Sequence, residues 1–249
     1  MRDLPPAREW FIRGSALGTV PMPRIDFQMH TRWTDGRSSV EAMIASATAK
    51  GLHAMAITEH VNEGSAWYPD FVADVKTQRG DGHGLAVYFG AEIAAADYCG
   101  GLKANPALLE SELILGVVHR LPKQDGSGFW KFEELTAEDG IDLEIQALAG
   151  LATNPSIDVL GHPGGTAFRK FGPFPVEWMK PAFLAAREHG VAVELNTKYL
   201  WDVDGMCALL RETDTLVSFG SDAHDAGDVG GNVAVMREHF AKFRTLTFS

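Results

Sequence analysis

The sequence predicts an α/β fold, a parallel sheet that is closed or wound and covered by outer helices. Two observations support this class. Short apolar runs of the kind that form buried strands recur along the chain, and helical patterns separate several of them. The apolar runs are Ile25–Phe27, Ala54–Ile57, Leu85–Phe89, Leu113–Val118, Ile157–Leu160, Val191–Leu195 and Thr215–Phe219.

The first helix is expected to begin after Ser38, because Glu41 stands three residues later as in a capping box. Apolar residues recur at helical spacing over 40–47, and Gly51 is placed to end the helix. Further helices are predicted at 141–152, 181–189 and 206–211. Loops rich in glycine, proline and aspartate are predicted at 62–84, 96–106, 122–140 and 164–175.

Length and charge narrow the possible classes of protein. The chain has 249 residues and a formal net charge of −11, so we expect one domain over 1–249, with 1–24 as an extended leader onto the first strand. The negative charge disfavours a broad nucleic-acid surface. Two distant cysteines, no apolar run of membrane-spanning length and no convincing signal peptide favour a cytoplasmic protein that does not enter the membrane. The oligomeric state is left open.

Histidine and acidic side chains follow one predicted strand after another. The carboxyl ends of parallel strands meet at one edge of a sheet, where ligands usually bind. Imidazole and carboxylate groups are the usual ligands of zinc, iron or manganese in catalytic sites. The strand ends therefore predict a metal-dependent hydrolase. The residues that follow the strands are Gln28, His30, Asp35, His60, Glu92, His119, His162, Glu194, Asn196, Asp222 and His224.

These residues, in this order, resemble the PHP family, named for its polymerase and histidinol phosphatase members. The family signature Asp-Leu-His-x-His-Thr-x-x-Ser-Asp-Gly corresponds to Asp-Phe-Gln-Met-His-Thr-Arg-Trp-Thr-Asp-Gly at 26–36. Later motifs correspond to Thr-Glu-His at 58–60, Glu92, His119 and His-Pro at 162–163. The final Gly-Ser-Asp-Ala-His at 220–224 matches the family motif residue for residue. The resemblance covers about residues 25–240, nearly the whole chain.

The resemblance implies a distorted (β/α)7 barrel, similar to a TIM barrel, that binds two or three divalent ions (zinc, manganese or iron). One site would use Gln28, His30, Glu92 and Asp222, and a second would use Glu92, His119 and His162. A third would use Asp35, His60 and His224. Two residues depart from the pattern. Glu59 replaces an aspartate that is not usually a ligand, and Gln28 replaces a histidine with a neutral amide, a weaker ligand for zinc.

The function predicted from these residues is hydrolysis of a small phosphomonoester by a metal-bound hydroxide, with His224 and Asp222 as catalytic residues. Arg120, Lys198 and Arg32 are the expected substrate contacts. Two alternatives stay open. The first is hydrolysis of a phosphodiester, or of a C–N or C–O bond, at the same metal site. The second is a non-catalytic module for binding a metal or a nucleotide, weakened by Gln28.

Overall fold

The computed structural model describes residues 4–80 and 84–246. Within these residues the chain forms one eight-stranded sheet in the order β1-β8-β7-β6-β5-β4-β3-β2. Strands β2 to β8 are parallel to one another, and β1 pairs antiparallel with β8. The strands are β1 (Ile12–Arg13), β2 (Ile25–Asp26), β3 (Ala54–Val61), β4 (Ala86–Ala94), β5 (Leu113–Val117), β6 (Val159–Leu160), β7 (Ala192–Asn196) and β8 (Leu216–Gly220).

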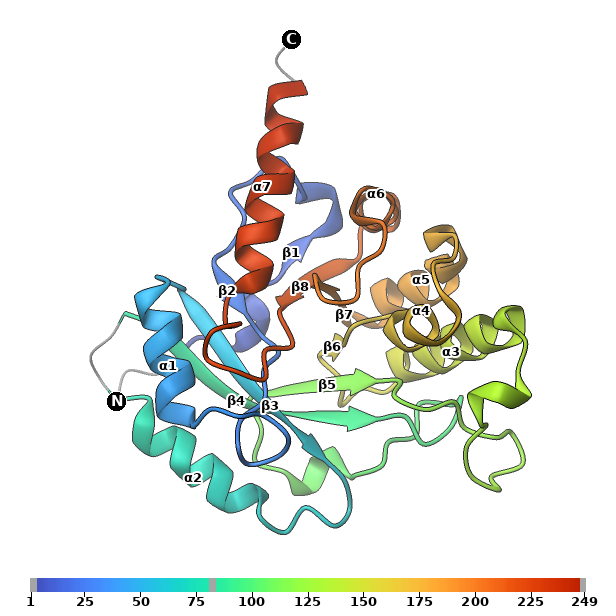
Figure 1. Cartoon of the computed structure of the whole chain (residues 1–249), viewed down its shortest axis with the longest axis horizontal. Coiled ribbons are helices and arrows are strands. Elements are labelled where there is room, and N and C mark those ends of the chain that lie inside the picture. The colour runs from blue at the N-terminus through green and yellow to red at the C-terminus, as the bar shows by residue number, and fades with distance from the viewer. Residues whose placement is uncertain (1–3, 81–83, 247–249) are drawn as a thin grey trace.

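The sheet curls until β2 returns to β8 (Figure 1). The amide of Phe27 donates to the carbonyl of Phe219 at 2.8 Å, and the amide of His30 donates to the carbonyl of Ala223 at the same distance. Met29 also forms a parallel bridge with Ala223. These backbone contacts join the two ends of the parallel sheet, so the predicted (β/α)7 barrel-like fold is confirmed.

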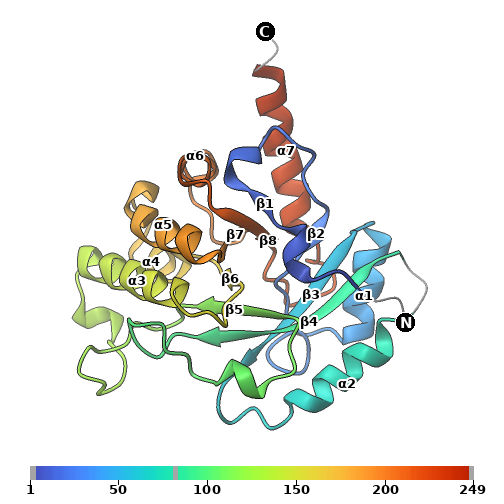
Figure 2. The ribbon, with the colours of Figure 1, turned by 180° about the vertical axis from the view of Figure 1, so that it is seen from behind.

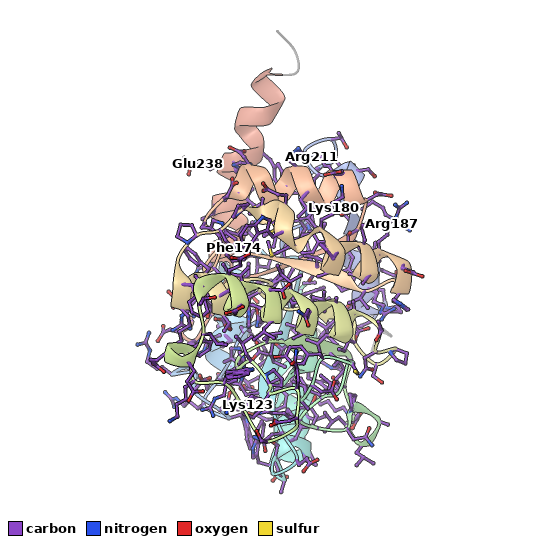
Figure 3. All side chains as sticks on the ribbon, turned by 90° about the vertical axis from the view of Figure 1, so that its right-hand side faces the viewer. Lys123, Phe174, Lys180, Arg187, Arg211 and Glu238 are labelled. Carbon is purple, nitrogen blue, oxygen red and sulfur yellow. The ribbon has the colours of Figure 1, made fainter. Side chains whose placement is uncertain are left out.

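Helices cover the outside of the curled sheet. Helices α1 and α2 lie on one side, and α3, α4 and α5 lie on the other (Figure 1). From that second side, α3, α5 and α6 appear as successive layers, with α7 rising beyond them (Figure 3). The α-helices are α1 (Val40–Ala49), α2 (Tyr68–Gln78), α3 (Ala137–Ala152), α4 (Gly165–Phe171), α5 (Lys180–His189), α6 (Val203–Thr213) and α7 (Gly231–Leu246).

Short 3-10 turns join these elements. They are η1 (Ala7–Trp10), η2 (Gly14–Ala16), η3 (Pro106–Leu108), η4 (Phe132–Glu134) and η5 (Val176–Met179). Along the described residues, no helix combines the length and apolar character needed to cross a membrane.

The start of α1 differs from the prediction. Ser39, and not Ser38, caps this helix, because its hydroxyl accepts a hydrogen bond from the amide of Ala42. The Ser38 hydroxyl instead accepts from the amide of Ala226 and ties the helix to the loop after β8. The expected end is correct, since Gly51 has a φ of 64° directly after the capping residue Lys50.

Three other predictions need correction. The expected loop at 62–84 contains α2, and the expected loop at 164–175 contains α4; residues 81–83 lie outside the described part. The long helix α7 was not predicted. Residues expected to form an extended leader supply β1, which pairs with β8 (Figure 2). The leader also contacts the last helix, since an added Cβ at Gly18 would lie 3.8 Å from the Phe240 ring.

Candidate metal centre

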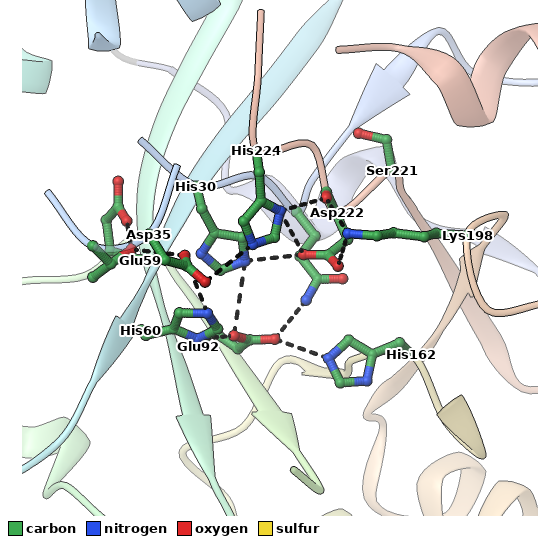
Figure 4. A network of polar contacts seen from close by, with 12 residues as sticks. His30, Asp35, Glu59, His60, Glu92, His162, Lys198, Ser221, Asp222 and His224 are labelled. Carbon is green, nitrogen blue, oxygen red and sulfur yellow. Dashed lines mark hydrogen bonds and ion pairs between the residues drawn. The ribbon is translucent and has the colours of Figure 1, made fainter. Parts of the chain in front are cut away.

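Glu92 lies at the centre of the group of side chains that the sequence predicted as ligands (Figure 4). It projects from β4 and is 1% exposed. His162 Nε2 lies 3.0 Å from Glu92 Oε1, and His119 Nε2 lies 3.6 Å from the same oxygen. The other oxygen contacts His60 Nδ1 and lies 3.8 Å from His30 Nε2. One buried carboxylate therefore faces four imidazole rings from four different strand ends.

His30 shows that this group suits a cation. Its ring is fully buried, yet neither nitrogen has a partner that satisfies hydrogen-bond geometry within the described residues. A buried nitrogen without a partner costs free energy unless another group, such as a metal ion, uses its lone pair. The nearest acid is Asp222, with its Oδ1 3.1 Å from His30 Nε2. Imidazole and carboxylate donors are those that zinc, iron and manganese take in proteins.

A second set of donors lies toward the solvent. Asp35 lies 3.5 Å from His60 Nε2 and 3.3 Å from His224 Nε2. The ligand atoms of His30, His60 and His224 lie within 4.8 Å of one another, as do those of His60, Glu92 and His119. His60 belongs to both sets, because one ring nitrogen faces Glu92 and the other faces Asp35. The described residues thus offer adjacent donor sets that share a ligand.

The backbone beyond β8 fixes the tautomer of His224. Its Nδ1 lies 2.8 Å from the carbonyl oxygen of Asp222, so Nδ1 carries the proton and donates it there. The other ring nitrogen, Nε2, then points toward Asp35. Asp222 itself has a φ of 51°, and His162 has a φ of 30°. Such left-handed conformations are costly for non-glycine residues and are typical of functional sites.

Gln28 is in the predicted place but makes different contacts from those of a ligand. Its amide nitrogen donates to Glu92 at 2.6 Å, and its amide oxygen accepts from Asn196 Nδ2 at 2.8 Å. The orientation of Asn196 is set by Lys198, whose backbone amide donates to Asn196 Oδ1 at 3.0 Å. Reversing the Gln28 amide would place its oxygen against an ionised carboxylate and its nitrogen against another donor. The oxygen expected to bind metal is therefore already used.

Several buried acids hold the loops that carry the ligands. Glu59 accepts from the amide and hydroxyl of Thr31, at 2.8 and 2.5 Å, and from the hydroxyl of Thr34, which precedes Asp35. Glu194 accepts from the backbone amide of His162 at 2.7 Å. These contacts set the backbone next to Asp35 and His162, so Glu59 has a clear positioning role that the sequence did not indicate.

The Asp222 carboxylate is held by two neighbours of β7. Lys198 Nζ lies 2.9 Å from Asp222 Oδ2, and the Tyr199 hydroxyl donates to the same oxygen at 2.8 Å. This leaves Oδ1 facing His30. Tyr199 also packs against His162, with ring centroids 5.1 Å apart. Tyr199 was missed at the sequence level because its neighbours resemble any loop after a strand.

The titration of the centre reflects its concentrated charge. Burial alone would raise the pKa of Glu92, but contacts with His119, His162 and His60 hold it well below its usual range. Burial alone would lower the pKa of His60 and His162, yet the contacts with Glu92 raise both to about 9. Protons thus balance the carboxylate charge in the metal-free protein. A divalent cation can take over this role and release them.

A pocket of about 720 Å³ opens over these residues. Its floor includes the expected ligands Asp35, His60, Glu92, His119, His162, Asp222 and His224. Arg120 and Lys198 line it as expected. Arg32 does not line it; its guanidinium Nε donates to the carbonyl of Arg37. The remaining lining residues are Tyr199 and residues of 129–133 and of α4, two segments that the sequence indicated only as loops.

Comparisons with known proteins show the family to which the chain is similar. The PHP domain model matches residues 26–198. A protein named as a probable phosphatase from Edwardsiella ictaluri is 27% identical over 220 residues, covering 84% of this chain and 82% of that protein. Another so named, from Thermoanaerobacter sp. (strain X514), is 25% identical over 206 residues, covering 78% of this chain and 75% of its own.

A solved structure shares the fold. The histidinol phosphate phosphatase of Lactococcus lactis has a TM-score of 0.63 at 14% identity, and the match covers 87% of this chain and 93% of that one. That structure is a complex with zinc, L-histidinol and phosphate. The curled parallel sheet and the donor set at its carboxyl edge define a metal-dependent hydrolase. Within this class, the chain belongs to the PHP domain family.

Proposed function

We propose that the protein is a phosphatase that hydrolyses a small phosphomonoester. The observation that carries the proposal is the single buried carboxylate, Glu92, facing four histidine rings on the floor of an open pocket. A pocket of about 720 Å³ suits a small molecule. The matched proteins named as phosphatases support the choice of a phosphate ester. Two free thiols, Cys99 and Cys207, are consistent with the cytoplasmic location that we also propose.

We assign the ligands as follows. His30, Glu92 and Asp222 would hold one ion, and Glu92, His119 and His162 a second. Asp35, His60 and His224 would hold a third. Gln28 is left out, because its amide joins Glu92 to Asn196. Zinc is the ion we favour, since each of these sets contains imidazole nitrogen.

The bound ions would polarise the phosphoryl oxygens and lower the pKa of a water molecule. The chain supplies the rest. Lys198 and Tyr199 fix Asp222 through its Oδ2, and Glu194 fixes the backbone of His162. Lys198 lies between the pocket and a second hollow of about 760 Å³, where its ammonium can bind a phosphate oxygen. The catalytic roles expected of His224 and Asp222 stay predictions.

The test is phosphate release from a panel of phosphomonoesters by protein stripped with a chelator and reloaded with zinc, manganese or iron. We expect turnover that depends on the added metal and is abolished in His162→Ala. A phosphodiester and an amide substrate in the same panel separate the rival reactions. Failure of every reloaded sample to release phosphate would overturn the proposal.

A further inference from the structure

Basic side chains gather in the pocket beyond the expected ligands. Among the described residues that line it, five are basic: Arg120, Lys131, Arg169, Lys170 and Lys198. The acids in the same lining are the three expected ligands and Glu133. The chain as a whole carries a net charge of −11. A concentration of positive charge in the substrate pocket of an acidic protein indicates an anionic ligand.

Four of these cations have no carboxylate within salt-bridge distance in the described part of the chain. They are Arg120, Lys131, Arg169 and Lys170. Some surface cations elsewhere are paired with acids, as Arg79 is with Glu112 and Lys180 with Glu212. Lys198 is also paired, with Asp222. These four cations are therefore available to a ligand.

The unpaired cations of α4 lie beyond the expected ligands. Arg169 Cζ is 5.8 Å from the centroid of the Tyr199 ring, and the hydroxyl of that ring reaches Asp222. Gly165 packs at the same ring, where an added Cβ would lie 3.1 Å from Tyr199 Cγ. Arg169 comes four residues later, about 6 Å further along the helix axis. Lys170 Nζ lies 4.8 Å from the centroid of the Phe132 ring, which also lines the pocket.

The position of these cations indicates what they bind. Metal ions held by the expected ligands would neutralise the phosphoryl group that is transferred, together with Lys198, since Lys198 and most of these ligands line the pocket. Arg169 lies over the Tyr199 ring, whose hydroxyl contacts Asp222, and Lys170 lies by the Phe132 ring. They would leave a neutral or cationic remainder of a substrate facing unbalanced positive charge. An anionic remainder would be attracted instead.

We propose that the substrate is a phosphomonoester with a second anionic group, which Arg169, Lys170 and Arg120 bind while the metal centre holds the group to be cleaved. This inference rests on the proposed phosphatase function and adds the charge of the rest of the substrate. It sets this pocket apart from one that takes L-histidinol phosphate, whose remainder carries an amine.

Pairs of substrates that differ in the charge of the remainder test whether the pocket binds a second anionic group. Fructose 1,6-bisphosphate is compared with fructose 6-phosphate, 3-phosphoglycerate with glycerol 3-phosphate, and both pairs with L-histidinol phosphate. We expect the probe with the extra anion to have a kcat/KM higher by about tenfold or more, the value of one charge-assisted hydrogen bond. L-Histidinol phosphate should be the poorest probe. Calorimetry of each probe reports binding whether or not it is hydrolysed.

Two variants and a control connect this preference to α4. Arg169→Ala should bring the ratio within each pair close to one, and Arg169→Glu should make L-histidinol phosphate the better ligand. Arg187→Ala is the matched control, because Arg187 is likewise exposed in the last turn of a helix but lies on α5, outside the pocket. It should keep the preference of the unmodified protein.

Equal kcat/KM and equal affinity within both pairs would overturn the inference while leaving the phosphatase function intact. A preference that survives Arg169→Glu would overturn it too. Binding that prefers the second anion, without phosphate release from any probe, would support the pocket assignment and remove the phosphatase function instead. The two failures are therefore distinguishable.

Discussion

Two fully buried acids in different regions of the molecule titrate in opposite directions. Glu92 lies at the mouth of the barrel among histidine rings, and its pKa is held well below the usual range. Glu144 lies between α3 and α4, where its carboxylate accepts hydrogen bonds from the amides of Thr166 and Ala167. Burial dominates there and raises the pKa of Glu144 to about 7.

The comparison shows that the direction of the pKa shift of a buried carboxylate depends on the groups that surround it. Burial raises the pKa of Glu144 more than the partial charges of the backbone amides at the start of α4 and the charge of His162 lower it. Rings that can take up full positive charge outweigh burial around Glu92. The surroundings of Glu92 therefore favour an ionised carboxylate beside cations. Glu144 instead positions α4 through its hydrogen bonds to the backbone of that helix.

The largest effect is expected when the negative charge of Glu92 is removed. Glu92→Gln keeps the shape but leaves the four rings without a carboxylate. Loss of a residue that merely orients a ligand costs 10–100-fold in metal affinity or activity, so we expect more than about 100-fold here. Metal content after dialysis and kcat/KM measure it. Glu133→Gln, at an acid in the same pocket, should keep both values within a few-fold; retention of metal by Glu92→Gln would contradict the assignment.

A smaller loss is expected when the support of the centre is weakened. Tyr199→Phe removes the hydroxyl that donates to Asp222. We expect metal affinity or activity to fall by about 10–100-fold, with the fold unchanged. Metal titration against a competing chelator measures it. Tyr88→Phe is the control, since the Tyr88 hydroxyl donates to the Pro5 carbonyl instead. Equal metal affinities of the two variants would show that the Asp222 contact is unimportant.

The third test restores a ligand in place of an amide. Gln28→His breaks the link from Glu92 to Asn196 and adds an imidazole beside His30. We expect tighter binding at the site of His30 and Asp222, by about tenfold or more, because imidazole is the better zinc ligand. Elemental analysis at limiting zinc measures it. Gln146→His, on the exposed side of α3, controls for a histidine added elsewhere. Unchanged zinc affinity would mean that Gln28 already serves the metal.

The smallest effect is expected for Glu144, which lies between α3 and α4, and it concerns stability. The folded-state pKa of Glu144 is about 7 against a usual 4.5, so the folded protein favours the protonated form. Its contribution to stability is present below pH 4.5 and is lost as pH rises to 7. Relative to Glu144→Gln, the unmodified protein should lose at most about 3 kcal/mol of unfolding free energy over that interval. Urea unfolding from pH 4.5 to 8 measures this, with Glu138→Gln as the exposed control. Parallel pH profiles for the two chains would rule out the shift.

The sequence predicted the parallel strands better than it predicted the short helices. The apolar runs predicted β2 to β8 because both faces of a parallel strand are covered, so each strand reads as a continuous apolar segment. Local signals were weaker elsewhere. Helix α4 has seven residues and starts with a glycine, and α2 has few apolar residues beyond its buried face. Both resemble loops until tertiary packing selects the helix.

The site, too, was predicted only where its residues follow local sequence motifs. Motif order brought nearly all the expected ligands together, because the carboxyl ends of neighbouring strands must converge. The contact between Gln28 and Asn196 could not be predicted, since the two residues are 168 positions apart and both partners of the Gln28 amide come from distant strands. The basic character of the pocket was predicted in part, since Arg120 and Lys198 were expected substrate contacts and both line it. It arises from segments that lie far apart in the sequence, 120–133 and α4, and meet only in the barrel.

The meeting of β2 and β8 has a consequence for the synthesis of the protein. His30 leaves the ribosome early, whereas Asp222 and His224 follow β8, the last strand of the sheet. A growing chain therefore carries unpaired imidazoles until β8 closes against β2. Ions acquired before that point could not be held by both ends of the chain. Stable metal retention would then distinguish finished barrels from incomplete chains.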